Sequence, residues 1–270
     1  SYNFNVNFEV DFNPNPSSSD TSTISLAGGS TDLDLFLDNL VEDVDLNQNF
    51  KVILSNNLTV DAGWQIKNLS LDYREIFAGQ EVTNIQSNPK IYSSFINMTS
   101  KPLPILYFNS GLRISKYNRY DKVLFSPTFG VKYNPFSDLA IKASLGRYSQ
   151  FLYTINQEEE LLRIVDFWQP IPDGQKPQQA DHLIIGSEYW ISTGNTISLE
   201  TYFKSYSSIY DLNPAPDYEN VEQTLAIDGT AKAYGIELLY RFNINKFNGW
   251  MSYAFSNIRR KVDLNSDSIL

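Results

Sequence analysis

Apolar and polar residues alternate with a period of two along most of this chain. The first segment follows the pattern without a slip: even positions from Tyr2 to Phe12 are apolar, and odd positions from Asn3 to Asp11 are polar. Successive side chains of a β-strand point to opposite faces. The pattern therefore predicts a strand over residues 2–12 with one apolar and one polar face.

Ten further segments are interpreted as strands, most of them from the same alternation, so the sequence predicts about eleven antiparallel strands and an all-β fold. These segments are 44–54, 60–73, 90–99, 105–117, 125–133, 139–145, 183–191, 197–203, 234–242 and 251–255. Two of them are irregular. Apolar residues occupy both faces of 90–99, and in 60–73 the apolar parity shifts near Leu69–Tyr73, which we interpret as a β-bulge.

The connections between these segments alternate in length. Short polar turns are expected at 55–57, 100–104, 134–138, 192–195 and 243–248. Longer loops are expected at 13–36, 75–89, 152–180 and 213–229, with a shorter one at 118–122. Outer-membrane barrels have tight periplasmic turns at one rim and long extracellular loops at the other, whereas a soluble sheet has no reason to sort its loops in this way. The sequence therefore favours a transmembrane β-barrel whose long loops face outward.

Charged residues within the predicted strands lie on the parity opposite to the apolar residues. A Lys or Arg that faced lipid at mid-depth would cost on the order of 2–4 kcal/mol, so we expect these charges to face the lumen. They include Arg113, Lys132, Lys142, Glu188, Glu200, Lys204, Glu237 and Arg241. Such charges line a substrate path, pair across strands or hold a domain inside the barrel. A half-buried soluble sheet would also keep charges on its wet face, so the loop lengths carry more weight.

Composition narrows the functional classes. The chain has no Cys, a single His (His182) and a net charge of −10, which argue against a thiolate metal site, imidazole chemistry and a nucleic-acid partner. No nucleophile elbow, zinc-binding helix or phosphate-binding loop is present, and the acidic residues between Asp32 and Asp45 lack the spacing of a calcium loop. We therefore expect no enzyme activity, no catalytic residue, no metal and no cofactor.

The loop 152–180 holds the candidate ligand-binding residues. Tyr153 and Trp168 offer rings for stacking, and Arg163 offers a guanidinium for a carboxylate or phosphate. A short helix is expected over residues 157–167, with its acidic residues at the N-terminal end. The alternative is that Trp168 only packs the loop against the barrel rim.

Several motifs occur in an order typical of one family. The clearest are Gly111–Arg113, Phe125–Tyr133, Lys142–Tyr148, Gly229–Glu237 and Trp250–Ser256. Lys176–His182 and Glu200–Lys204 add to them. Together they resemble the barrel of TonB-dependent outer-membrane receptors, especially those of Bacteroidota. Where the family often has Arg after the strand proline, this chain has Thr128, so no role of that Arg is carried over.

The resemblance implies a 22-stranded barrel closed by an N-terminal plug. Residues 1–270 would then be a partial transmembrane β-barrel domain that lacks the plug and the terminal strands. The odd strand number, and a chain that stops at Ser268–Leu270 inside a polar stretch, also predict a piece of a longer barrel.

The function implied is TonB-energised uptake of a large scarce solute, such as a siderophore, a cobalamin-like compound or an oligosaccharide, across the outer membrane of a Gram-negative bacterium. Its expected partners are outer-membrane lipid, the TonB complex through the missing plug, and a surface lipoprotein. Two alternatives stay open at this point: a passive porin or structural outer-membrane barrel, and a secreted soluble β-protein that binds glycans.

Overall fold

The structure is a computed structural model in which residues 3–12, 19–26, 33–77, 79–155, 167–212, 226–244 and 246–262 are described. All regular elements in these residues are β-strands. They are β1 (Asn3–Phe12), β2 (Ser19–Leu26), β3 (Leu33–Ser55), β4 (Leu58–Phe77), β5 (Gln80–Ser87), β6 (Lys90–Leu103), β7 (Leu106–Tyr117), β8 (Val123–Phe136), β9 (Leu139–Gln150), β10 (Leu152–Ile155), β11 (Phe167–Pro170), β12 (Gln178–Ser192), β13 (Asn195–Leu212), β14 (Ala226–Ile244) and β15 (Phe247–Val262).

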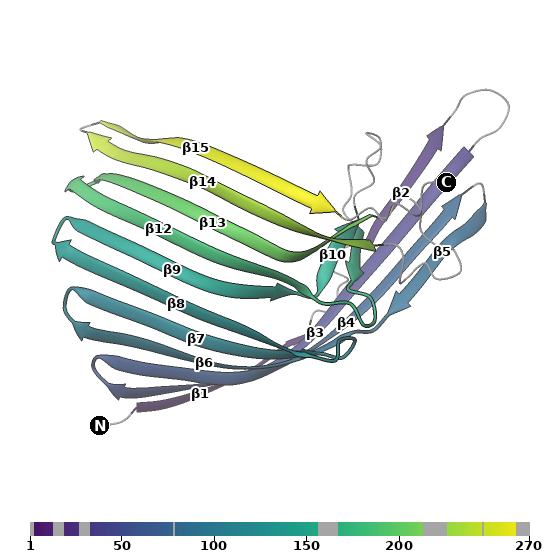
Figure 1. Cartoon of the computed structure of the whole chain (residues 1–270), viewed down its shortest axis with the longest axis horizontal. Coiled ribbons are helices and arrows are strands. Elements are labelled where there is room, and N and C mark those ends of the chain that lie inside the picture. Colours follow the sequence, from purple (N-terminus) through teal and green to yellow (C-terminus); the bar gives the residue numbers. More distant parts are fainter. Residues whose placement is uncertain are drawn as a thin grey trace.

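Eleven of these strands form one continuous antiparallel path, in the order β1-β3-β4-β6-β7-β8-β9-β12-β13-β14-β15. They correspond one to one with the eleven strands predicted from the alternation, which confirms the all-β prediction. Each strand pairs with its predecessor and its successor on this path, and Figure 1 shows the result as a curved wall. Within the described residues β1 and β15 are the two ends of the path and do not pair with each other.

Tight turns close one end of the wall. Two residues separate β3 from β4, β6 from β7, β8 from β9, β12 from β13 and β14 from β15, so all five predicted short turns are confirmed. The turn between β12 and β13 contains Gly194 with φ +86°. Only glycine adopts this backbone conformation without a steric cost, which explains its position in a two-residue hairpin.

Three of the predicted loops contain strands instead. β2 lies within 13–36 and pairs with β3, and β5 lies within 75–89 and pairs with β4. β3 and β4 have 23 and 20 residues, so with β2 and β5 they extend the wall at the long-loop end. The loop 152–180 contains the hairpin β10–β11. The helix expected over 157–167 falls outside the described residues except at Phe167, which begins β11 rather than ending a helix.

The bulge predicted near Leu69–Tyr73 is wrong. The pairing of β4 with β3 runs without a register shift from Phe77 to Thr59. Leu69, Leu71 and Tyr73 therefore share a side with Lys67, and they are 3–4% exposed. They are apolar because hydrophobic residues of the hairpin β10–β11 and of the segment after it cover them on that side.

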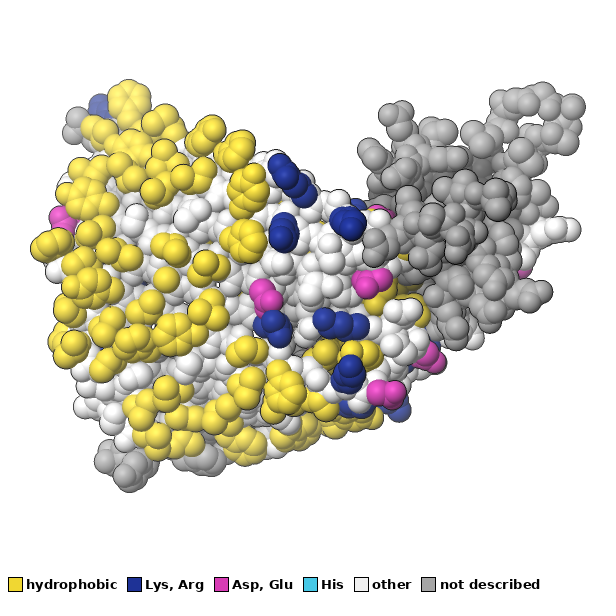
Figure 2. Space-filling view, in the orientation of Figure 1, with side chains coloured by type: hydrophobic (Ala, Val, Ile, Leu, Met, Phe, Trp, Pro, Cys, Tyr) yellow, Lys and Arg dark blue, Asp and Glu magenta, His cyan; other side chains and the backbone are white. Residues whose placement is uncertain are grey.

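The opposite side of the sheet carries exposed apolar residues. Figure 2 shows them as a broad band over the strands toward the tight turns. Side chains such as Ile96, Leu145, Ile185 and Phe255 are about half exposed, at 52%, 52%, 47% and 51%. A contiguous exposed apolar band of this kind marks an interaction surface, and on a sheet of this kind it is typical of a lipid-facing surface. We call this side outward and the other inward. The described residues contain no helix with the length and apolarity needed to cross a membrane.

Candidate functional site

The hairpin β10–β11 crosses the inward face of the wall. β10 contacts β13, whereas β11 contacts β3 and β4. Five strands separate β4 from β13 along the sheet, so a single hairpin can touch both only by lying inside the curve. The loop expected to project outward from the rim therefore folds back over the inner wall.

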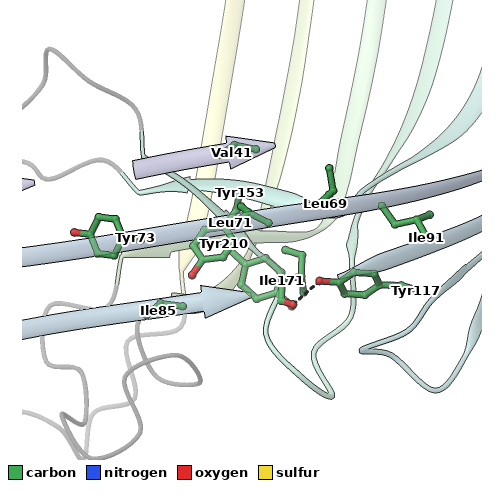
Figure 3. Packing of buried hydrophobic residues seen from close by; sticks show 10 residues of the cluster. All are labelled: Val41, Leu69, Leu71, Tyr73, Ile85, Ile91, Tyr117, Tyr153, Ile171 and Tyr210. Carbon is green, nitrogen blue, oxygen red and sulfur yellow. Dashed lines mark hydrogen bonds between the residues drawn. The ribbon is translucent and has the colours of Figure 1, made fainter. Parts of the chain in front are cut away.

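A buried cluster fixes the hairpin there. Figure 3 shows ten hydrophobic residues that come from the wall, the hairpin and the segment after it. Tyr117 and Ile171 have no exposed surface, and Tyr153 is 3% exposed. The Tyr153 ring packs against the Tyr210 ring with centroids 5.6 Å apart. The apolar inward residues of β4 belong to this cluster, which explains why alternation fails at 69–73.

Hydrogen bonds to backbone groups complete the attachment. The Tyr117 hydroxyl donates to the Ile171 carbonyl at 2.8 Å, and the Tyr210 hydroxyl donates to the Lys176 carbonyl at 2.8 Å. Tyr210 lies beyond Phe203, the last outward apolar residue of β13, and so outside the membrane-spanning part of that strand. Burial raises the pKa of Tyr210 to about 12. Its hydroxyl therefore stays protonated and available as a donor at physiological pH.

Next to the hairpin, on the side toward the tight turns, the inward face is hollowed and polar. A concavity of about 640 Å³ is lined by residues of β4, β6, β7, β8 and β9. Arg113 Nη1 donates to Gln65 Oε1 at 2.9 Å, and its guanidinium lies over the Phe95 ring at 5.2 Å. Gln65 in turn donates to Asp45 at 2.5 Å, and Lys67 forms an ion pair with Asp43 at 2.6 Å. This network presents donors and acceptors side by side.

Three aromatic side chains stand beside this network. The rings of Tyr148 and His182 are 4.8 Å apart, and those of His182 and Tyr206 are 6.3 Å apart. They come from β9, β12 and β13 and share the inward side with Lys204, which lies directly opposite His182. Tyr148 is 51% exposed and lines the concavity. The combination of stacking surfaces and a cation is suited to a large polar solute.

A second inward concavity, of about 410 Å³, lies closer to the tight turns. It is lined by Lys132, Lys142 and Glu200, among others. Lys142 forms an ion pair with Glu188 across the β9–β12 boundary at 2.6 Å. Glu200 lies directly opposite Glu237 in the β13–β14 register. Such exposed ion pairs contribute little to stability, so the face stays available to other charged groups.

The register puts all eight charged residues predicted to face the lumen on the inward side. Arg113 lines the larger concavity, Lys132, Lys142 and Glu200 line the smaller one, and Glu188 pairs with Lys142. The Lys204 ammonium lies 4.9 Å from the centre of the Tyr202 ring. Glu237 and Arg241 continue the same side of β14. Their contact with a substrate stays a prediction.

The three loop candidates are not brought together as a ligand site. Tyr153 is buried in the cluster, and Arg163 lies outside the described residues. Trp168 is 36% exposed, but both of its backbone polar groups are bonded to the side chain of Asn39. In this arrangement Tyr153 and Trp168 attach the loop to the wall. Their role in ligand binding stays a prediction.

Sequence reasoning missed Asn39, Lys67, Tyr148 and Tyr210. For Asn39 no signal exists in the sequence, since its partner lies far along the chain. The apolar residues at 69–73 did contain a signal. Inward apolar side chains on a barrel strand indicate that another segment covers them, which would have pointed to an inserted loop.

The fold and its two faces define the class of this protein: an antiparallel membrane barrel wall with a lipid-type outer face and a polar inner face. The comparison with known families agrees and is more specific. The family model described as TonB dependent receptor-like, beta-barrel, matches residues 1–269. The chain belongs to this family, whose members are transport proteins of the Gram-negative outer membrane and not enzymes.

Solved structures of this class share the fold. The FrpB iron transporter from Neisseria meningitidis matches with a TM-score of 0.62 at 15% identity, covering 93% of this chain and 44% of that one. The alcaligin outer-membrane receptor FauA from Bordetella pertussis gives 0.57 at 14% identity, covering 85% and 41%. The RagAB peptide transporter gives 0.54 at 13% identity, covering 86% and 31%.

At these identities the likeness concerns the fold alone. The chain spans less than half the length of each of these structures. No curated protein sequence matches it.

Proposed function

We propose that residues 1–270 are the middle part of the barrel of an outer-membrane receptor that imports a large scarce solute with energy from the TonB complex. The family match over residues 1–269 carries this proposal. The outward apolar band supports insertion in the outer membrane, and it argues against a secreted soluble glycan-binding protein, which would expose that band to water.

The inward face supports a solute that is both polar and able to stack. The Arg113–Gln65 network offers hydrogen bonds to carboxylate or hydroxyl groups, and the exposed Tyr148 ring offers a flat apolar surface. Siderophores, cobalamin-like compounds and oligosaccharides combine both properties. The related structures carry the names of an iron transporter, an alcaligin receptor and a peptide transporter, so a peptide belongs to the same range.

The proposed partners follow from the same assignment. Lipid contacts the outward band, TonB acts through a plug encoded outside this chain, and a lipoprotein at the cell surface is the third partner. The complex between FpvAI and pyocin S2 is a structure of this fold with a bound protein.

The experiment that tests the proposal uses the full-length protein in a Gram-negative host. Membrane fractionation should recover it in the outer membrane. Uptake of its solute, identified by growth on candidate iron chelates, cobalamin or glycans, should stop in a strain without TonB. Uptake that continues without TonB, together with ion conductance of the reconstituted protein, would instead identify a passive porin.

A further inference from the structure

One row of residues crosses five strands on the outward face at the edge of the apolar band. Each member lies directly opposite the next in the register of β9, β12, β13, β14 and β15. The row reads Arg147, Asp181, Ser205, Lys232 and Arg259. The next row toward the tight turns reads Leu145, Leu183, Phe203, Tyr234 and Asn257. The outer surface therefore changes from apolar to charged within a single step along the strands.

The two ends of the charged row differ. Arg147 and Asp181 form a two-point ion pair, with distances of 2.7 Å and 2.9 Å, and so neutralise each other. Lys232 lies directly opposite Arg259, and Lys261 lies two residues further along β15 on the same side. All three side chains are exposed, and no described residue forms a hydrogen bond or ion pair with them. We call these three residues the basic triad.

Cations that face each other across a strand pair repel. The triad therefore lowers the stability of the β14–β15 edge on its own, and an anion between the three side chains would reverse that effect. Lys232 and Arg259 are direct cross-strand neighbours, and Lys261 is a diagonal neighbour of Lys232. Such neighbours lie about 5 Å and about 7–8 Å apart, which is within reach of one phosphate for side chains of this length.

The level of the triad indicates the source of the anion. The outward apolar residues of β12 run from Leu183 to Ile191. Eight residues at about 3.4 Å each, tilted by about 40°, give a height of about 20 Å. This is close to the roughly 25 Å of the apolar band in outer-membrane barrels. The triad begins one row above the band, where lipid head groups lie. Figure 2 shows Lys and Arg side chains beside the hydrophobic band on this side.

We propose that Lys232, Arg259 and Lys261 bind the phosphate group of an outer-leaflet lipid whose acyl chains lie along Tyr234 and Ile236. This inference rests on the proposed position of the protein in the outer membrane. A lipid fits better than free phosphate because the apolar side chains directly below the triad can hold its acyl chains. Arg and Lys both form short charge-assisted hydrogen bonds to phosphate oxygens.

The test measures lipid binding to the full-length protein in detergent by native mass spectrometry. The probe is diphosphorylated lipid A, compared with the same lipid after removal of its phosphates. The double variant Lys232→Gln/Arg259→Gln should bind the diphosphorylated lipid about tenfold or more weakly than the unchanged protein. Binding of the dephosphorylated lipid should be the same for both.

A matched variant controls for the loss of two positive charges. Lys101→Gln/Lys246→Gln removes two cations at the tight-turn end of the wall and should bind the phosphorylated lipid like the unchanged protein. The variant Lys232→Arg/Arg259→Lys keeps both charges and should retain binding. Heat-dependent mobility on gels identifies any variant that fails to fold. If Lys232→Gln/Arg259→Gln fails to fold, the single variant Lys261→Gln replaces it and should also bind the diphosphorylated lipid more weakly.

Equal weakening in both double variants would overturn the inference, and so would unchanged binding in Lys232→Gln/Arg259→Gln. Competition by inorganic phosphate as strong as that by the lipid would show a free-anion site and not a lipid site. A protein that binds no lipid and is absent from the outer membrane would contradict the proposed function itself. The two failures are therefore distinguishable.

Discussion

Asn39 and Trp168 are 129 residues apart in sequence, yet the side-chain amide of Asn39 bonds to both backbone polar groups of Trp168. Asn39 Nδ2 donates to the Trp168 carbonyl at 3.3 Å, and the Trp168 N–H donates to Asn39 Oδ1 at 3.2 Å. The amide acts as a neighbouring peptide unit would in a sheet. It ties β11 to β3, with which β11 shares no strand pairing in the described residues.

We expect Asn39→Ala to release the hairpin β10–β11 locally. The change leaves two backbone groups of Trp168 without partners, which costs about 1–3 kcal/mol for each group that stays buried. Hydrogen exchange of residues 152–155 and 167–170 should become at least tenfold faster, while exchange in β8 and β9 stays unchanged. Asn49→Ala on the same strand, remote from the hairpin, is the control. Unchanged exchange in the hairpin would show that the apolar cluster alone holds it.

We expect Tyr117→Phe to destabilise the attachment by about 1–2 kcal/mol, because the buried Ile171 carbonyl loses its donor. Tyr117→Ala should cost about 3–5 kcal/mol, since it also leaves a cavity where no surface is exposed. Urea unfolding in lipid vesicles measures both. Tyr148→Phe, whose side chain is half exposed, should have no effect above about 0.5 kcal/mol. A loss in Tyr148→Phe as large as in Tyr117→Phe would contradict the assignment.

A pair of neighbouring substitutions tests which face contacts lipid. Ile185 is outward and 47% exposed, whereas Ile184 lines the inward concavity. We expect Ile185→Arg to lower the free energy of unfolding in a bilayer by about 2–4 kcal/mol, and Ile184→Arg to lower it by less than about 1 kcal/mol. Urea titrations of refolding into vesicles give both values. If the two costs were reversed, the assignment of the faces would be wrong.

The turn glycine Gly194 provides a test of backbone strain and crowding together. Its φ is +86°, and a Cβ there would lie 2.9 Å from Asn243 Cβ. Gly174 has a similar φ of +78°, but a Cβ there would meet nothing within 4 Å. Gly194→Ala should therefore cost more than the roughly 1 kcal/mol expected for Gly174→Ala from φ alone. Thermal unfolding of both variants compares them, and equal costs would exclude the crowding.

The wall of the barrel could be predicted from the sequence, because lipid on one side and water on the other impose a strict period of two. The five tight turns follow from the same logic. The prediction fails where a third environment exists. Leu69, Leu71 and Tyr73 are inward yet apolar, because they meet protein and not water. A rule that knows only lipid and water does not account for such residues, and it therefore predicts a bulge where the strand is regular.

The candidate site could be predicted only in part. The face on which Arg113 or Glu200 lies follows from its odd or even position along the strand, because that face depends only on local strand geometry. The pairing of Arg113 with Gln65 depends on two strands on either side of β6, and the docking of Tyr153 depends on how a long loop folds. Such contacts depend on tertiary packing that no period in the sequence encodes. For this reason the sequence alone predicts that the loop 152–180 projects away from the barrel.

The hairpin across the inner wall has a mechanical consequence. β4 and β13 are two points on an arc, and β10–β11 is the chord between them. The five strands between β4 and β13 fix the length of the arc, and a chord of fixed length then also fixes its radius. The wall therefore resists flattening and widening at the level of the hairpin. Toward the tight turns no such chord exists among the described residues. There the strand pairing alone sets the curvature, whereas at the outer level the hairpin sets it as well.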